Sequence, residues 1–131
     1  MTVVPALPTS ATFLDFWTQR RLCTVTTLRP DGTPHVVPMG VVIDPETDTA
    51  WAITSRTSRK ARNLISNPTI AVCCVDGRHW STIEGTAIVT DDPDLVAEAE
   101  RRYAERYKVP RDNPSRVAIR ISVTRNLGNV D

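Results

Sequence analysis

The sequence predicts a mainly β fold of the α+β class, a six-stranded antiparallel barrel with short flanking helices. Six segments alternate apolar with polar side chains or are rich in β-branched residues, and short turns typical of hairpins join most of them. Helical segments separate only some of the strands, which disfavours a parallel sheet of strand–helix–strand units. The length of 131 residues is expected to form a single domain, residues 1–131.

The first half of the chain is expected to form one helix and three strands. Thr9 or Ser10 caps the helix, whose apolar face includes Phe13 and Trp17. The motif Arg-Pro-Asp-Gly at residues 29–32 is typical of a tight turn, because Pro fixes φ and Gly accepts a positive φ. The expected strands cover residues 22–28, 34–43 and 50–54, with a second turn at residues 44–48.

The second half is expected to add two helices and three strands. Ser58 is a good N-cap for a short helix that Pro68 ends, and Asp92 precedes a longer helix with Pro93 at its first position. Gly85 interrupts an otherwise regular strand, which indicates a bulge or a close backbone approach. The expected strands cover residues 69–75, 80–90 and 117–123.

Composition and charge disfavour several classes of protein. Sixteen Lys and Arg residues against fifteen Asp and Glu residues leave a net charge of +1, whereas nucleic-acid-binding proteins usually carry a marked basic excess. No apolar run is long enough for a membrane helix, and the N-terminus lacks the features of a secretory signal. Three cysteines without Cys-x-x-Cys spacing argue against a disulfide framework or a zinc site. The chain is therefore expected in the cytoplasm, with no nucleic acid, membrane or metal as a partner.

The most informative charge pattern is a basic segment around the expected helix at residues 58–67. No acidic residue occurs between Asp48 and Asp76. Cations in a first helical turn are unfavourable, because the helix N-terminus already carries partial positive charge. Together with the free N–H groups of the helix start and the Ser58 hydroxyl, these cations would form a binding site for an anion, usually phosphate. The alternative is that the segment is simply a basic helix end exposed to solvent. The four cations are Arg56, Arg59, Lys60 and Arg62.

Other polar residues receive less specific roles. His35 and His79 lie beside hairpin turns and are expected to be exposed or packed, with lining of a substrate pocket as the alternative. Glu84 is expected to pair with an arginine, although it is also a general acid candidate. Cys73 and Cys74 point to opposite faces of one strand, so at most one lines any pocket and a core role is favoured. No catalytic residue is assigned.

Four further motifs occur in order along the chain. They are LRPDGTPHVV (28–37), TSRTSRKARNLISNP (54–68), WSTIEGTA (80–87), and YAERY followed by PRDNP (103–107 and 110–114). This ordered set resembles the pyridoxamine 5′-phosphate oxidase-like split β-barrel superfamily over a core of roughly residues 10–128. Within it, the chain resembles most the branch that uses the deazaflavin coenzyme F420, in the group that contains biliverdin reductases.

The resemblance implies a split β-barrel enzyme that transfers a hydride from reduced coenzyme F420 to a small-molecule substrate, a conjugated organic acceptor such as biliverdin or a quinone. The flavin-dependent oxidases usually have Arg at the position of Val37 and a C-terminal arginine segment, and these differences favour F420 over FMN. The alternatives are an FMN-binding oxidase or reductase of the same family and a non-catalytic F420 or flavin carrier. An oligonucleotide-binding barrel ranks last, because few aromatic residues fall on the expected strands.

The resemblance also implies which residues hold the cofactor phosphate. Arg59 and Lys60, together with Ser58, match the family's phosphate-binding segment. Asn63 matches a polar helix position near the phosphate or the tail beyond it. The strand end beside the phosphate is matched by Ile53 and Thr54.

The cofactor ring is matched by a different part of the chain. Val37, Pro38 and Met39 match the strand whose backbone lies along the ring. Family members are homodimers with two sites at the interface. Trp80 is therefore expected to reach a cofactor that the other chain mainly holds.

Overall fold

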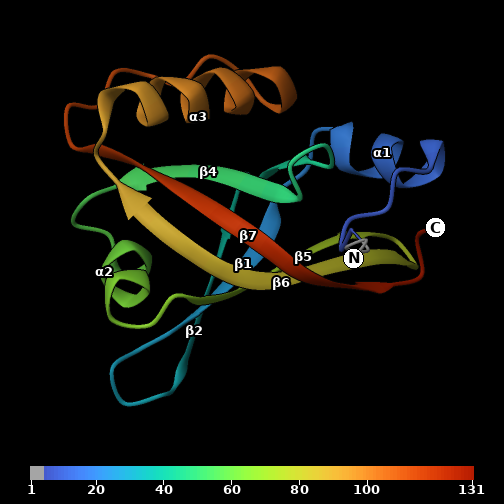
Figure 1. Ribbon diagram of the computed structural model, residues 1–131, viewed down its shortest axis with the longest axis horizontal. Coiled ribbons are helices and arrows are strands. Elements are labelled where there is room, and N and C mark those ends of the chain that lie inside the picture. Colours follow the sequence, from blue (N-terminus) through green and yellow to red (C-terminus); the bar gives the residue numbers. More distant parts are fainter. Residues whose placement is uncertain (1–4) are drawn as a thin grey trace, which may run out of the picture.

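The computed structural model describes residues 5–131 as one seven-stranded sheet with three helices (Figure 1). The helices are α1 (Ala11–Thr18), α2 (Arg59–Ser66) and α3 (Pro93–Arg106), and the strands are β1 (Cys23–Leu28), β2 (Pro34–Met39), β3 (Val42–Asp44), β4 (Thr49–Ser55), β5 (Thr69–Asp76), β6 (His79–Thr90) and β7 (Arg116–Gly128). The strand order is β2-β1-β5-β6-β7-β4-β3, and every neighbouring pair is antiparallel. The predicted α+β class with a mainly antiparallel sheet is confirmed. The predicted absence of a signal rests partly on residues 1–4, outside the described residues.

Two parts of the predicted architecture are wrong, because the sheet has seven strands rather than six and is open rather than closed. The predicted strand at residues 34–43 is two strands, since Gly40 and Val41 separate β2 from β3. β2 pairs with β1 at one edge of the sheet, and β3 pairs with β4 at the other. A two-residue link therefore joins the two edge strands, and the sheet must curl to bring its edges near each other there.

Gly40 lies in this link because two tyrosine rings approach it closely. A Cβ atom at position 40 would lie 2.7 Å from the Tyr107 ring and 2.9 Å from the Tyr103 ring. These rings stack at a centroid separation of 4.9 Å at the C-terminal end of α3. The Tyr107 hydroxyl accepts a hydrogen bond from the Val41 N–H at 3.1 Å and donates one to the Arg21 carbonyl at 2.8 Å. The end of α3 is thus fastened to the link between the edge strands.

Local sequence signals placed the helix starts and one irregularity of the sheet correctly. Ser10, Ser58 and Asp92 each cap a helix by accepting backbone N–H groups of its first turn. The register of β6 against β7 shifts at Gly85, where a Cβ atom would collide with the Ser122 carbonyl. The predicted close backbone approach at Gly85 is therefore confirmed.

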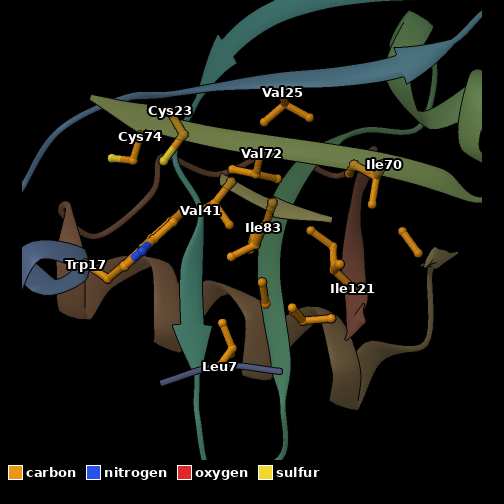
Figure 2. Close-up of a cluster of buried hydrophobic side chains, with 14 of the residues drawn as sticks. Leu7, Trp17, Cys23, Val25, Val41, Ile70, Val72, Cys74, Ile83 and Ile121 are labelled. Atoms are coloured by element: carbon orange, nitrogen blue, oxygen red, sulfur yellow. The ribbon is translucent and has the colours of Figure 1, made fainter. Parts of the chain in front are cut away.

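The main apolar core is a single cluster that joins α1 to the sheet. Phe13 and Trp17 of α1 and Ile83 and Ile119 of the sheet are among its largest fully buried side chains. Figure 2 shows Trp17 and Ile83 within this cluster. The Trp17 indole N–H donates to the Ser81 hydroxyl at 3.0 Å, which satisfies the one polar group of this buried ring.

A buried arginine, Arg106 of α3, is only 5% exposed. Its guanidinium donates to the carbonyls of Gln19 at 3.0 Å and Val41 at 2.6 Å. It also lies 3.7 Å from the Cys23 sulfur and 3.5 Å from the Cys74 sulfur. Among residues 5–131, no carboxylate is within ion-pair distance of Arg106. The two thiols are therefore the ionisable groups that its guanidinium contacts directly.

Cys23 of β1 and Cys74 of β5 lie opposite each other, one position beyond the Thr24–Cys73 pair that ends the hydrogen-bonded ladder of these strands. Figure 2 shows Cys23 and Cys74 side by side at one end of the core. Both are buried, which confirms the core role predicted for Cys74. A hydrogen bond from the Cys23 thiol lowers the pKa of Cys74 to about 6 against the effect of burial, and the Arg106 guanidinium acts in the same direction. The same pairing raises the pKa of Cys23, so we expect Cys74 to be the thiol of the pair that ionises.

We expect the free energy of unfolding to fall as the pH drops through about 6, because protonation removes the Cys74 thiolate beside Arg106. An unperturbed thiol titrates near about 8.5, so between roughly pH 6 and 8.5 the folded chain has released a proton that the unfolded chain still binds. Stability therefore rises with pH across this window and is lost below it. Urea unfolding at several pH values measures the effect.

The test compares Cys74→Ala with Cys73→Ala, which removes the adjacent thiol from the opposite face of β5. Cys73→Ala should keep the wild-type pH dependence, and Cys74→Ala should flatten it across this window. Wild-type pH dependence in Cys74→Ala would show that Cys74 is not ionised in the folded chain.

Candidate functional site

The N-terminus of α2 collects hydrogen-bond donors at one point of the surface. β4 ends at Ser55, and the Ser58 N–H donates to the Ser55 carbonyl at 3.0 Å in the turn that leads into α2. The Ser58 hydroxyl accepts from the Ala61 N–H at 3.3 Å and from the Thr54 hydroxyl at 3.1 Å. Thr54 thus orients the capping side chain. The free N–H groups of the first turn and the positive end of the helix dipole favour an anion here.

Two cations occupy the first turn of α2. Arg59 is exposed and Lys60 is half-buried, and burial lowers the pKa of Lys60. In the described part of the chain, neither has a carboxylate within ion-pair distance. Partial burial of an ammonium group without a counterion is unfavourable. An anion bound beside Lys60 would therefore relieve this cost.

His35 of β2 lies within electrostatic range of the same cations. Burial, followed by the positive charges of Arg29, Lys60 and Arg59, lowers the pKa of His35. The Nδ1 atom of this ring is buried, with no hydrogen-bond partner among residues 5–131. The structure therefore brings a residue that was expected beside a turn into the charged site. We call Ser58, Arg59, Lys60 and His35 the anion cluster.

One face of β2 connects the anion cluster to a cleft. His35, Val37 and Met39 are half-buried along this strand, while Val36 and Pro38 on the other face are exposed. Met39 lines a cleft of about 530 Å³. It lies four residues beyond His35, a span of about 13 Å at the usual rise of a strand. This face of β2 therefore runs from a cationic point of the surface to a partly apolar cleft.

The cleft has an apolar floor and a cationic rim. Met39, Gly40, Ile53 and Tyr103 form its floor, from β2 and its link, β4 and α3. Leu22, ahead of β1, adds a further apolar side chain. The rim consists of Lys108, Val109, Pro110 and Arg111 from the connection between α3 and β7, together with Arg116 at the start of β7.

Two arginines near these sites already have acidic partners. Arg116 contacts the Glu100 carboxylate at 2.7 Å, and its side chain is 9% exposed. Arg56 contacts Asp91 at 3.3 Å, with both side chains exposed. The absence of acidic residues between Asp48 and Asp76 had indicated that Arg56 is uncompensated. Its partner Asp91 comes from outside this segment, so the free positive charge at Arg56 is smaller than the sequence indicated.

Two other predicted site residues differ in where they lie: Asn63 is buried next to the anion cluster, because its partner Thr27 is the cross-strand neighbour of His35, whereas Trp80 lies apart from the cluster. Asn63 is 1% exposed, and its amide donates to the Thr27 hydroxyl at 3.0 Å, which ties α2 to β1. Trp80 is 36% exposed at the start of β6, at the end of the molecule opposite α2 (Figure 1). Within one chain, Trp80 therefore does not share a site with Lys60.

The part of the cleft that α3 supplies was not predicted from the sequence. Gly40 falls inside the expected strand at residues 34–43, and Tyr103 occurs only as the first residue of the YAERY motif. A glycine within a strand pattern was the available signal, since it often marks a close approach of another group. Nothing local to the sequence indicates that Lys108 and Arg111 return to β2.

The remaining candidate residues lie outside the cleft. Glu84 contacts Arg125 at 3.5 Å, which confirms its predicted pairing with an arginine. His79 is exposed in the hairpin between β5 and β6. Among residues 5–131, no three side chains of metal-binding type are grouped to hold an ion. The helices of the described chain lack the length and apolar character to cross a membrane.

The fold and the site define a domain with a donor-rich, cationic helix start at one end of a strand face and an apolar cleft at the other. The family model described as pyridoxamine 5′-phosphate oxidase matches residues 9–127. A relative from Mycobacterium tuberculosis, described as an F420H2-dependent biliverdin reductase, is 45% identical over 118 residues, which cover 90% of this chain and 86% of the relative. The chain therefore belongs to the pyridoxamine 5′-phosphate oxidase family, and the resemblance predicted from its motifs is confirmed.

Solved structures share the fold over nearly the whole chain. A conserved hypothetical protein from Mycobacterium tuberculosis superposes with a TM-score of 0.77 and 26% identity, covering 98% of this chain and 88% of that one. A structure described as an F420 reductase superposes with a TM-score of 0.72 and 23% identity, covering 92% of this chain and 98% of that one.

We expect an anion bound at the anion cluster to raise the pKa of His35, because it offsets the positive charges of Arg59 and Lys60. NMR titration of the His35 ring with and without inorganic phosphate measures this change. In Lys60→Ala the pKa of free His35 should already be higher, and phosphate should shift it less. His79, at the opposite end of the sheet, is the internal control and should not respond. An unchanged His35 pKa at saturating phosphate would place the anion elsewhere.

Proposed function

We propose that this protein is a reductase that transfers a hydride from reduced coenzyme F420 to a conjugated organic acceptor such as biliverdin or a quinone. The structural observation that carries this proposal is the single face of β2 that joins the anion cluster to the apolar cleft. The 45% identical relative named an F420H2-dependent biliverdin reductase supports F420 as the coenzyme and an enzymatic reduction as the function. It also makes biliverdin the first acceptor to test.

The residues of the anion cluster fit the phosphate of such a coenzyme. Ser58, Arg59 and Lys60 would hold it together with the N–H groups of the first turn of α2. Thr54 orients the Ser58 hydroxyl through their hydrogen bond. Asn63 would not contact the phosphate; it would position the site indirectly, because its hydrogen bond to Thr27 holds α2 against β1.

The face of β2 and the cleft fit a flat ring. Val37 and Met39 would lie beside it, with the backbone at Pro38 between them, and Ile53 lies at the floor of the same cleft. The bound coenzyme supplies the hydride, so the chain needs no covalent nucleophile. The protein contributes binding, orientation and an apolar surface that excludes part of the solvent.

We assign the proton of the reduction to water rather than to His35. That ring lies at the anion end of β2, about 13 Å along the strand from Met39. Solvent reaches the cleft, because Leu22 and Val109 on its lining are 64% and 81% exposed.

We also propose a cytoplasmic homodimer in which Trp80 reaches the site of the partner. Val75 pairs with Trp80 across β5 and β6, and Leu127 pairs with Thr82 two residues further along. The exposed fractions of Val75, Trp80 and Leu127 are 56%, 36% and 39%. Such an exposed apolar patch is typical of a protein contact. Light scattering that shows a stable monomer would contradict the proposed homodimer.

The proposed cytoplasmic location is supported by the three free thiols, which suit a reducing compartment.

Replacing Lys60 with Ala should weaken binding of oxidised F420 by about 10- to 150-fold, the equivalent of about 1.5–3 kcal/mol for a hydrogen bond to a charged group. Fluorescence quenching of the coenzyme measures the affinity. Arg62→Ala is the comparison variant, because it removes an exposed cation of the same helix beyond the first turn, and it should weaken binding less than Lys60→Ala does. Unchanged binding in Lys60→Ala would place the phosphate elsewhere.

The same titration with FMN tests the choice of coenzyme. Tighter binding of F420, with oxidation of F420H2 by biliverdin, supports the proposed reductase. Equal or tighter binding of FMN would assign the protein to the flavin-dependent members of the family. Tight binding of F420 without turnover on any acceptor of a panel of tetrapyrroles and quinones would indicate a carrier.

A further inference from the structure

The connection between α3 and β7 places positive charge over the apolar cleft. Lys108 and Arg111 line the cleft with Met39, Ile53 and Tyr103, and none of the residues between 5 and 131 that line it is acidic. Apolar walls with a few positive groups at the rim are suited to a flat organic molecule that also carries negative charge.

The cations of the rim differ in whether an acidic side chain neutralises them. Arg116 is held by Glu100 at 2.7 Å, and it also donates to the Arg111 carbonyl at 2.8 Å. In the described chain, Lys108 and Arg111 have no carboxylate within ion-pair distance, and both side chains are exposed. Arg116 therefore fixes the backbone of the rim, while Lys108 and Arg111 keep their charges available.

We propose that the cleft takes an acceptor that bears carboxylate groups, and that Lys108 and Arg111 bind these carboxylates while its conjugated system would lie against the coenzyme ring on the apolar floor. The inference rests on the proposed function, because it names the substrate class of that site. The acceptor would be a flat molecule with carboxylate side arms, and biliverdin, with two propionates, has this chemistry.

The carboxylates of the coenzyme are the other possible source of negative charge. In F420 the phosphate lies between the ring and the glutamate-bearing tail. If Lys60 holds the phosphate and the ring lies toward Met39, the tail must leave the phosphate on the side away from the cleft. The rim cations are then free for the acceptor.

The decisive comparison is between biliverdin and its dimethyl ester, which has the same conjugated system without the charges. Binding is measured to the protein without coenzyme, by the absorbance change of the tetrapyrrole. The double variant Lys108→Ala/Arg111→Ala should bind biliverdin about tenfold more weakly than wild type, and each single variant about threefold more weakly. The ester should bind wild type and variants alike, and only the acid should lose affinity as salt rises.

Arg101→Ala is the matched control, because it removes an exposed cation of α3 that pairs with Glu98 and Glu105 away from the cleft. It should leave biliverdin binding unchanged. With F420H2 present, the double variant should raise the KM for biliverdin and leave kcat and the affinity for F420 near wild type.

Equal loss of the acid and the ester in the double variant, or no loss of either, would overturn the carboxylate assignment. The double variant could also lose affinity for F420 but not for a coenzyme that lacks the glutamates. That result would show that the rim binds the coenzyme tail, and it would likewise overturn the carboxylate assignment. Failure of wild type to bind F420 would instead contradict the proposed function, while tetrapyrrole binding without coenzyme would still decide the role of the rim.

Discussion

The guanidinium of Arg106 connects α3 to three other parts of the chain. From one buried position it reaches the end of α1 through Gln19, the link between the edge strands through Val41, and the paired strands β1 and β5 through Cys23 and Cys74. A buried charge without compensation would be costly, so these partners must keep their places together. The position of α3, and with it the wall and rim of the cleft, depends on this arrangement.

The cleft also depends on a constraint of chain length. Only Gly40 and Val41 separate two strands that belong to opposite edges of the sheet. The curl that this imposes brings Met39 of β2 and Ile53 of β4 into one cleft, although six ladders separate the outermost strands of the sheet. Tyr103 and Tyr107 fill the space above Gly40, so the absence of a side chain there is what lets α3 come close. The ligand groove is thus a consequence of an open sheet that almost meets itself.

Local and distant features of the molecule differ in how well the sequence predicts them. The start of α2 could be predicted because a capping serine, two cations and a terminating proline all lie within one short segment. The helix caps and the close approach at Gly85 are local in the same sense. The division of residues 34–43 into two strands could not be predicted, because it is caused by rings about 65 residues further along the chain. For the same reason, neither the pairing of Arg56 with Asp91 nor the return of Lys108 and Arg111 to β2 is visible in any local pattern.

The half-buried ammonium of Lys60 has a consequence for the lifetime of the protein. Without a ligand, the start of α2 holds Lys60 and Arg59 beside His35, and no acidic group in the described chain offsets them. The empty fold therefore carries a repulsion that an anionic ligand removes, and a ligand that binds only the folded state shifts the folding equilibrium toward it. The proportion of chains open to proteases would then fall as the supply of ligand rises, so the amount of protein would follow the amount of the molecule that it binds.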